Sequence, residues 1–312
     1  MPELAKAAGQ GPRQIGRCVW RPALGVVLLW TMAVPGAVAA DRSREQAIRI
    51  VTQVQRADYE GDRAALKRLH RELEPFLANK EIAVRIAYWR GFALWRRAIN
   101  GFNDATPPEE LQQDLKQALD EFNQAAQRDR SFEDAKIGAL SCAGLIGATL
   151  IQNNSARLQD ADVKGWWARV RQLTTEAQAI DPENPRLLWA MGPNVWHIPE
   201  ERGGGRAKAI EMYEKGLGVI RRHKPGSNDP LEPSWGEPEL LMSLAWSNLN
   251  RATPDPNAAE RYARSALAIV PYWHYVRDIL IPQIREAKVR QQAELVSSNR
   301  KLRSGARIEL KE

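Results

Sequence analysis

Three consecutive glycines at positions 203–205 precede a basic, alanine-rich run and are the first candidate for chemistry. Glycine loops that bind phosphate end in Lys and Ser or Thr, and they connect a buried strand to a helix. Here Arg206, Ala207 and Lys208 follow, with no hydroxyl residue in register, and the preceding segment has a helical pattern. We therefore expect the turn of a helical hairpin, where glycine adopts positive φ at little cost, rather than an anion site with Arg206 and Lys208.

Other residues with catalytic or ligand chemistry are scattered along the chain. The acid pairs at 109–110 and 200–201 adjoin prolines at expected helix starts, where acids offset the helix dipole. No G-x-S-x-G or comparable nucleophile motif occurs. The histidines form neither H-x-x-x-H nor H-E-x-x-H pairs; they are His70, His197, His223 and His274. We therefore predict no catalytic residue, no metal site and no cofactor.

The first 40 residues are typical of a secretory signal peptide. Three arginines precede the apolar run 23–34, and small residues at 36–40 provide a cleavage site. The run is shorter than the about 20 residues that a membrane-spanning helix needs. We expect cleavage near Ala39 or Ala40, a periplasmic or secreted mature protein, and no transmembrane segment after cleavage.

Charge and cysteine content limit the partners and the covalent chemistry of the mature chain. The first 40 residues hold four of the 45 basic residues and one of the 38 acids, so the mature chain has 41 and 37, a net charge of +4. The segment 285–312 alone carries that excess, and we expect it to be a basic helix or tail, partly disordered. The nearly neutral body gives no case for a nucleic-acid-binding face, so we expect no nucleic acid as a partner. Cys142, in an apolar stretch, is expected to be a buried thiol.

The residue pattern predicts an all-α protein. Ala, Leu, Glu, Gln, Arg and Lys dominate windows of 12–22 residues that Pro, Gly and Asn interrupt. No clear run alternates apolar and polar residues, and no Asn-Gly or Asp-Gly hairpin joins two such runs.

Small residues recur at the spacing i, i+4, i+7, which places them on one helix face that closely approaches another backbone. Three segments share this pattern: Ala118, Phe122 and Ala125; Ala209, Tyr213 and Gly216; and Ala259, Ala263 and Ala266. The expected partner helices carry Gly91, Gly192 and Ala245, and Pro182 and Pro271 follow two of the second helices.

These positions resemble the tetratricopeptide repeat (TPR). That repeat has Gly or Ala at position eight and Pro at position thirty-two. Between them it has Ala at position twenty, an aromatic residue at position twenty-four and Ala at position twenty-seven. Corresponding residues lie 39 to 52 apart here, not 34, which implies degenerate repeats with insertions. The segments 199–210 and 233–239 also resemble secreted bacterial repeat proteins of unassigned role. The resemblance implies a repeat domain over 41–284, an α-solenoid with a C-terminal capping helix from Tyr272 and about five hairpins: 42–77, 80–129, 131–180, 184–222 and 237–269.

In this family the first helices of successive hairpins line a concave groove. Carried over by repeat position, the groove residues are Arg85, Tyr88, Phe92 and Trp95; Arg186, Trp189, Pro193 and Trp196; and Glu239, Met242, Trp246 and Leu249. Protein interfaces favour aromatic residues and arginine, so the resemblance implies a groove that binds a peptide or protein. Two alternatives stay open: these aromatics form a core, or the helix that follows Tyr272 covers them.

The sequence thus predicts a non-enzymatic protein–protein interaction scaffold or adaptor of the bacterial cell envelope, with an unidentified protein or peptide as partner. One alternative is an envelope enzyme, such as a hydrolase, whose site is assembled across hairpins. The other is a structural oligomer that associates with itself through the aromatic face.

Overall fold

The computed structural model describes residues 35–152, 154–222 and 228–309, and it places side chains from residue 41 to residue 297 within those ranges. Every regular element in the described part is a helix, which confirms the all-α prediction. The expected signal peptide falls mainly outside the described residues, and only 35–40 are seen, at the start of the first helix.

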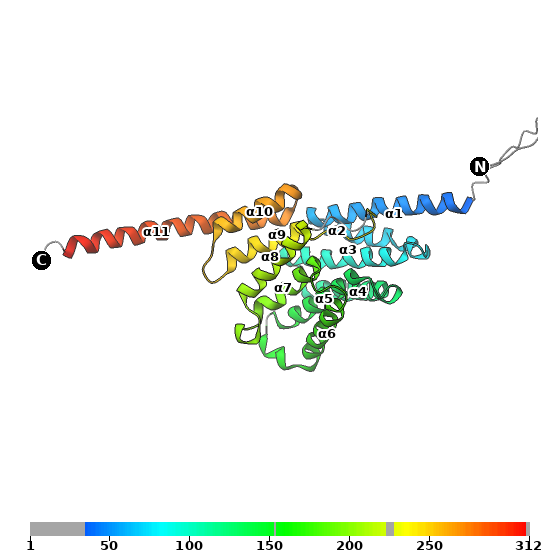
Figure 1. Cartoon of the computed structure of the whole chain (residues 1–312), viewed down its shortest axis with the longest axis horizontal. Coiled ribbons are helices and arrows are strands. Elements are labelled where there is room, and N and C mark those ends of the chain that lie inside the picture. The colour runs from blue at the N-terminus through cyan, green and yellow to red at the C-terminus, as the bar shows by residue number, and fades with distance from the viewer. Residues whose placement is uncertain (1–34, 153, 223–227, 310–312) are drawn as a thin grey trace, which may run out of the picture.

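Eleven α-helices lie within the described residues (Figure 1). They are α1 (Pro35–Glu60), α2 (Arg63–Glu72), α3 (Ala83–Asn103), α4 (Pro108–Arg128), α5 (Glu133–Ile151), α6 (Ala161–Gln178), α7 (Pro185–His197), α8 (Arg206–Arg222), α9 (Glu237–Asn250), α10 (Pro256–Ile269) and α11 (Ile281–Glu309). Short 3₁₀ segments at Glu74–Ala78, Ser155–Gln159 and Glu200–Arg202 and a π-helix, η4 (Tyr275–Leu280), join them.

The helices pack consecutively along the chain. Each of α1, α3, α5, α7 and α9 packs on the helix that follows it, and most pack on the helix before them as well. These odd-numbered helices also contact one another in order, α1 with α3, α3 with α5, α5 with α7, and α7 with α9. We call the surface that they share, opposite the even-numbered helices, the inner face.

Glycine is required where the helices approach most closely. A Cβ atom on Gly192 of α7 would lie 2.1 Å from a ring carbon of Tyr213 on α8, and one on Gly138 of α5 would lie 2.4 Å from the ring of Phe122 on α4. Such distances are shorter than any real carbon contact, so only hydrogen fits there. The alanines at the predicted repeat positions are fully buried: Ala118, Ala125, Ala209, Ala245, Ala259, Ala263 and Ala266.

The remaining repeat positions have similarly defined places. Gly91 faces the ring of Phe122, and Gly216 lies against Leu240 of α9. Pro182 and Pro271 lie in the exposed turns that follow α6 and α10. The glycine triplet forms the turn before α8, with φ of 81° at Gly203 and 102° at Gly205, so this turn uses backbone conformations that glycine adopts most readily.

The first and last helical pairs meet each other. The segment that follows α10 lies against the end of α1, where the rings of Tyr59 and Trp273 pack edge to face with centroids 5.0 Å apart. His274 packs on the backbone at Gly61, which has φ of 74°. The helices therefore form a closed arrangement rather than one with two free ends.

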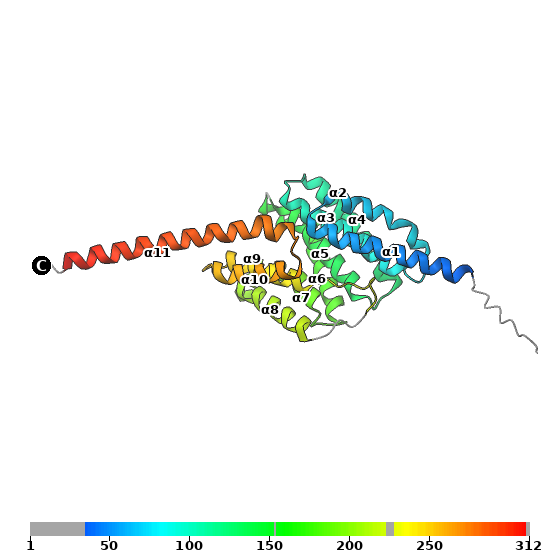
Figure 2. The same ribbon diagram turned by 90° about the horizontal axis from the view of Figure 1, so that it is seen from above.

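The C-terminal helix does not cover the inner face. Ile281 and Ile284 are buried at the start of α11, and Lys288 pairs with Glu260 of α10 at 2.6 Å. Beyond this point α11 projects away from the body (Figures 1 and 2), and Val289 is 69% exposed. The segment 285–312, predicted as a basic helix or tail, is helical as far as Glu309.

Among the described residues, α5 is long and apolar enough to cross a membrane. Its apolar character has another explanation in this structure, because the helix packs against α3, α4, α6 and α7 at once. A helix that is apolar on all sides is typical of a buried position as well as of a membrane.

Gly192→Ala should lower the free energy of unfolding of the mature protein by about 1–3 kcal/mol, because the added methyl group has no space beside Tyr213. Gly165→Ala on α6 is the matched control, since a Cβ atom added there would meet nothing within 4 Å, and it should leave stability unchanged or raise it by about 0.4–1 kcal/mol. Thermal unfolding followed by circular dichroism measures both. Equal midpoints for the two variants would contradict the close contact.

Candidate functional site

The inner face is occupied by a segment of the chain itself. Residues 228–236, which lead into α9, cross this face, and we call them the strap. Leu231 is fully buried and Trp235 is 4% exposed. The indole Nε1–H of Trp89 on α3 donates to the carbonyl of Leu231 at 2.8 Å, and that of Trp235 donates to the hydroxyl of Tyr88 at 2.8 Å. The strap is thus bound through both its main chain and its side chains.

Three arginines of the inner face hold the strap from different helices. Arg44 of α1 pairs with Asp229 at 2.6 Å, and Arg85 of α3 pairs with Glu232 at 2.7 Å. Arg186 of α7 donates to the carbonyl of Trp235 at 3.4 Å. These pairs are partly buried, so their attraction is screened less than that of surface pairs.

The predicted aromatic residues of α3 and α7 meet around Trp235. The rings of Trp95, Trp189 and Trp235 lie mutually edge to face, with centroids 5.4–5.9 Å apart. Tyr88 and Phe92 adjoin this cluster, and the Trp189 indole donates to Ser243 on α9 at 2.9 Å. Tyr88, Phe92 and Trp95 are at most 1% exposed. They are therefore core residues under the strap and offer no open surface, as the core alternative predicts.

The other predicted groove residues are divided between two environments. Arg85 and Arg186 are half-buried and paired with acids, and Glu239 is fully buried. Toward the far ends of α7 and α9, Trp196 packs on Trp246 at 5.1 Å, with Arg206 over the Trp196 ring. Met242 and Leu249 are half-buried, and Pro193 is exposed. This second region is the part of the predicted groove that keeps partial exposure.

A buried charge cluster connects the first, second and last helical pairs. The Arg96 guanidinium of α3 lies 2.7 Å from Asp58 of α1 and 3.8 Å from Glu239 of α9. The hydroxyl of Tyr59 donates to Glu239 at 2.8 Å, and the Asn100 amide donates to Asp58. The backbone N–H of Gly236 donates to the second carboxylate oxygen of Glu239, which fixes the end of the strap. The sequence patterns identified only Glu239, because the other partners have no characteristic spacing.

Burial determines the ionisation of this cluster. It raises the pKa of Asp58 and of Glu239, and it raises the pKa of Tyr59 well above its ordinary value. The nearby Arg96 charge opposes the first two shifts. Two carboxylates share one guanidinium, so the cluster is one positive charge short of neutrality when both acids are ionised.

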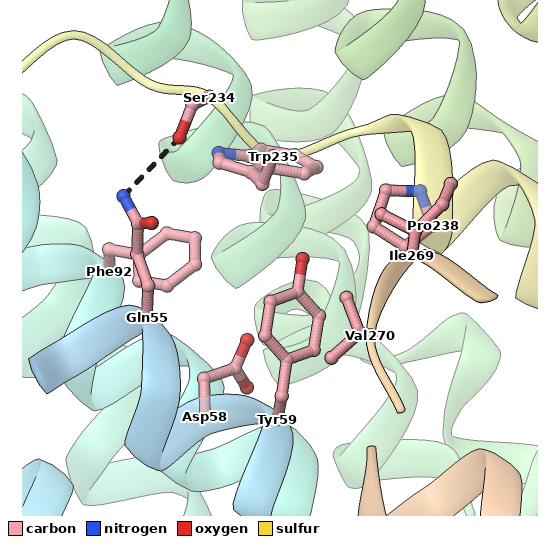
Figure 3. Close-up of a pocket in the computed structure, with 9 residues that line it drawn as sticks. All are labelled: Gln55, Asp58, Tyr59, Phe92, Ser234, Trp235, Pro238, Ile269 and Val270. Atoms are coloured by element: carbon pink, nitrogen blue, oxygen red, sulfur yellow. Dashed lines mark hydrogen bonds between the residues drawn. The ribbon is translucent and has the colours of Figure 1, made fainter. Parts of the chain in front are cut away.

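A small cavity of about 180 Å³ lies beside the charge cluster (Figure 3). Asp58 and Tyr59 rise from α1 on one side, and Trp235 of the strap lies opposite them. Gln55 donates to the Ser234 hydroxyl at 3.4 Å across the rim. The remaining lining residues are Phe92, Pro238, Ile269 and Val270.

A second buried carboxylate connects the start of α5 with the residue that caps α7. Glu133, at the start of α5, accepts from the Asn184 amide at 2.9 Å, while its other oxygen has no hydrogen-bond partner. Burial, together with the charges of Asp134 and Asp181, raises the pKa of Glu133 to about 7. The neighbouring Asp134 pairs with Arg186 at 2.8 Å, the residue that also contacts Trp235.

The described residues contain no group of three or more His, Cys, Asp or Glu that could hold a metal ion. His70 is buried and contacts Glu121 at 3.2 Å, and Arg90 pairs with the same carboxylate. Cys142 is buried in α5, and burial raises the pKa of its thiol well above its ordinary value, which keeps it protonated and unreactive.

No known protein family matches this sequence, and no curated protein matches it. Among solved structures, the chain is similar to the HusA haemophore from Porphyromonas gingivalis, with 18% identity and a TM-score of 0.50. The similarity covers 68% of this chain and 94% of HusA. At this identity the likeness bears on the fold alone.

Glu133→Gln should stabilise the mature protein by about 1–3 kcal/mol at pH 8.5 and have little effect at pH 4. The folded pKa of about 7 lies above the ordinary 4.5, so wild-type stability falls as pH rises between these values. The glutamine amide stays neutral and still accepts from Asn184. Urea unfolding at both pH values measures the difference, with exposed Glu214→Gln as control. An equal effect of Glu133→Gln at both pH values would contradict the shift.

Proposed function

We propose that this protein is a non-enzymatic protein–protein interaction scaffold of the bacterial cell envelope. In this proposal the chain is a closed α-solenoid of about five TPR-like hairpins, namely α1/α2, α3/α4, α5/α6, α7/α8 and α9/α10, followed by the helix α11. The order of helix contacts supports it, because successive first helices adjoin one another along the inner face, as in repeat proteins. Export through the N-terminal leader would place the scaffold in the periplasm or outside the cell.

The observation that carries the proposal is the strap itself. An irregular segment is held on the inner face by a main-chain carbonyl bonded to Trp89, by two buried apolar side chains and by two ion pairs. These are the contacts by which proteins recognise extended peptides, with main-chain bonds for affinity and pockets for specificity. The inner face is therefore chemically suited to a chain segment, and in this structure the segment is its own.

The strap also defines the chemistry of the proposed partner. Asp229 and Glu232 meet arginines, while Leu231 and Trp235 fill apolar space. A partner segment would accordingly carry acids close to a leucine and an aromatic residue, and it would compete with the strap. Met242 and Trp246 are half-buried, and the buried Trp196 packs against Trp246. This region lies along the same helices and would extend the contact.

A peptide of residues 228–236, labelled with fluorescein and added in trans, tests the proposal on the mature protein. Leu231→Ala/Trp235→Ala should free the inner face and bind this peptide, whereas the wild type should bind it at least about tenfold more weakly, because its own strap competes. Glu232→Ala, which loses only the pair with Arg85, should lie between them. Fluorescence anisotropy measures all three.

A peptide with Leu231 and Trp235 replaced by serine is the matched control and should bind to none of the proteins. Circular dichroism establishes that each variant keeps its helical content. Folded variants with no preference for the native peptide over the control peptide would overturn the proposal.

Two further measurements test the alternative functions. Light scattering over a range of concentrations tests the self-associating alternative, in which the measured mass rises with concentration. HusA is described as a haemophore, and a titration of the mature protein with haem, followed at the Soret band, tests that alternative. Saturable haem binding would indicate a carrier instead of a scaffold.

A further inference from the structure

The cavity beside the charge cluster combines aromatic walls with an acidic floor. Rings of Tyr59, Phe92 and Trp235 line it, and Asp58 projects toward it from α1 (Figure 3). Phe92, Trp235 and Asp58 are nearly fully buried, whereas Ile269 at the rim is 47% exposed. The site is thus a small chamber with preformed walls and an edge that reaches solvent.

The charge balance around the chamber favours a cation. Asp58 accepts from Arg96 and Asn100, and Glu239 accepts from Tyr59 and the Gly236 amide and lies near Arg96. One guanidinium thus serves two carboxylates, which leaves an excess of negative charge in a region of low dielectric when both acids are ionised. Attraction to a cation is stronger there than in water.

The aromatic walls favour an organic cation over a metal ion. The face of an aromatic ring attracts ammonium groups, and quaternary ammonium ligands are recognised by several rings around one charge. The walls offer few oxygen ligands, which Mg²⁺ and Ca²⁺ require. A volume of about 180 Å³ exceeds the about 150 Å³ of an apolar cavity that holds benzene, so a ligand of four to seven heavy atoms fits.

We propose that this chamber binds a small organic ammonium ion, with its methyl groups against Tyr59, Phe92 and Trp235 and its charge beside Asp58. The ion would supply the positive charge that the cluster lacks. This inference goes beyond the scaffold function and does not rest on it. It requires a seated strap, because Trp235 and Ser234 form part of the wall, whereas peptide binding requires the strap to leave.

Choline and its uncharged isostere 3,3-dimethylbutan-1-ol are the probes, added to the mature protein and followed by calorimetry and tryptophan fluorescence. Choline should bind saturably, and the alcohol at least about tenfold more weakly, because only the cation gains from the aromatic faces and the excess charge. Asp58→Asn should remove the preference for choline. Equal binding of the two probes, or binding of neither, would overturn the proposal.

A second pair of variants keeps the test decisive if Asp58→Asn fails to fold. Ile269→Trp places a bulky group at the exposed rim and should reduce choline affinity by about tenfold or more while leaving the melting temperature unchanged. Ile180→Trp is the control, since Ile180 is 42% exposed and lies in the turn after α6, outside the chamber lining. If Ile269→Trp binds choline as tightly as the wild type does, the ligand lies elsewhere and the assignment of the chamber is wrong.

Discussion

The closed arrangement of helices depends on one buried guanidinium. Arg96 lies at the junction of α1, α3 and α9, and its two carboxylate partners come from the first and the last helical pairs. Removal of such charges from water costs several kcal/mol per ion, which only close pairing and further hydrogen bonds offset. Asn100, Tyr59 and the Gly236 amide supply those bonds. If the closed arrangement opened, Asp58 and Glu239 could not both stay paired with Arg96. The junction therefore specifies one closed geometry.

The strap follows from the same closure. Helices that close on one another with apolar inner surfaces leave a space between them that side chains must fill, since protein interiors are packed without large voids. Trp235 fills that space against Trp95 and Trp189, and the strap's main chain finds donors on Trp89 and Arg186. The aromatic residues of the inner face are therefore a core that packs against an irregular segment of the same chain.

The sequence predicted the helical class and the expected positions of close contact, because both depend on residues three to eight apart. The small residue at Gly192 and the ring of Tyr213 belong to adjacent helices, whose spacing a repeat pattern encodes. The strap and the charge cluster were not predictable in this way. Trp89 bonds to Leu231 across 142 positions, and Tyr59 to Glu239 across 180. The strap itself is rich in proline and has no periodicity that would indicate burial.

One irregularity in the sequence did carry information about the strap. In the proposed TPR register, Ala209 and Ala259 are equivalent and yet lie 50 residues apart, where that repeat has 34. Both alanines are fully buried in their helices, so the surplus belongs to the connection between α8 and α9. That connection includes the strap. An insertion in a helical repeat is normally expected to extend a surface loop, but here its buried tryptophan and leucine show that it completes the interior. The same extra residues that disturb the repeat therefore create the wall of the chamber beside Asp58.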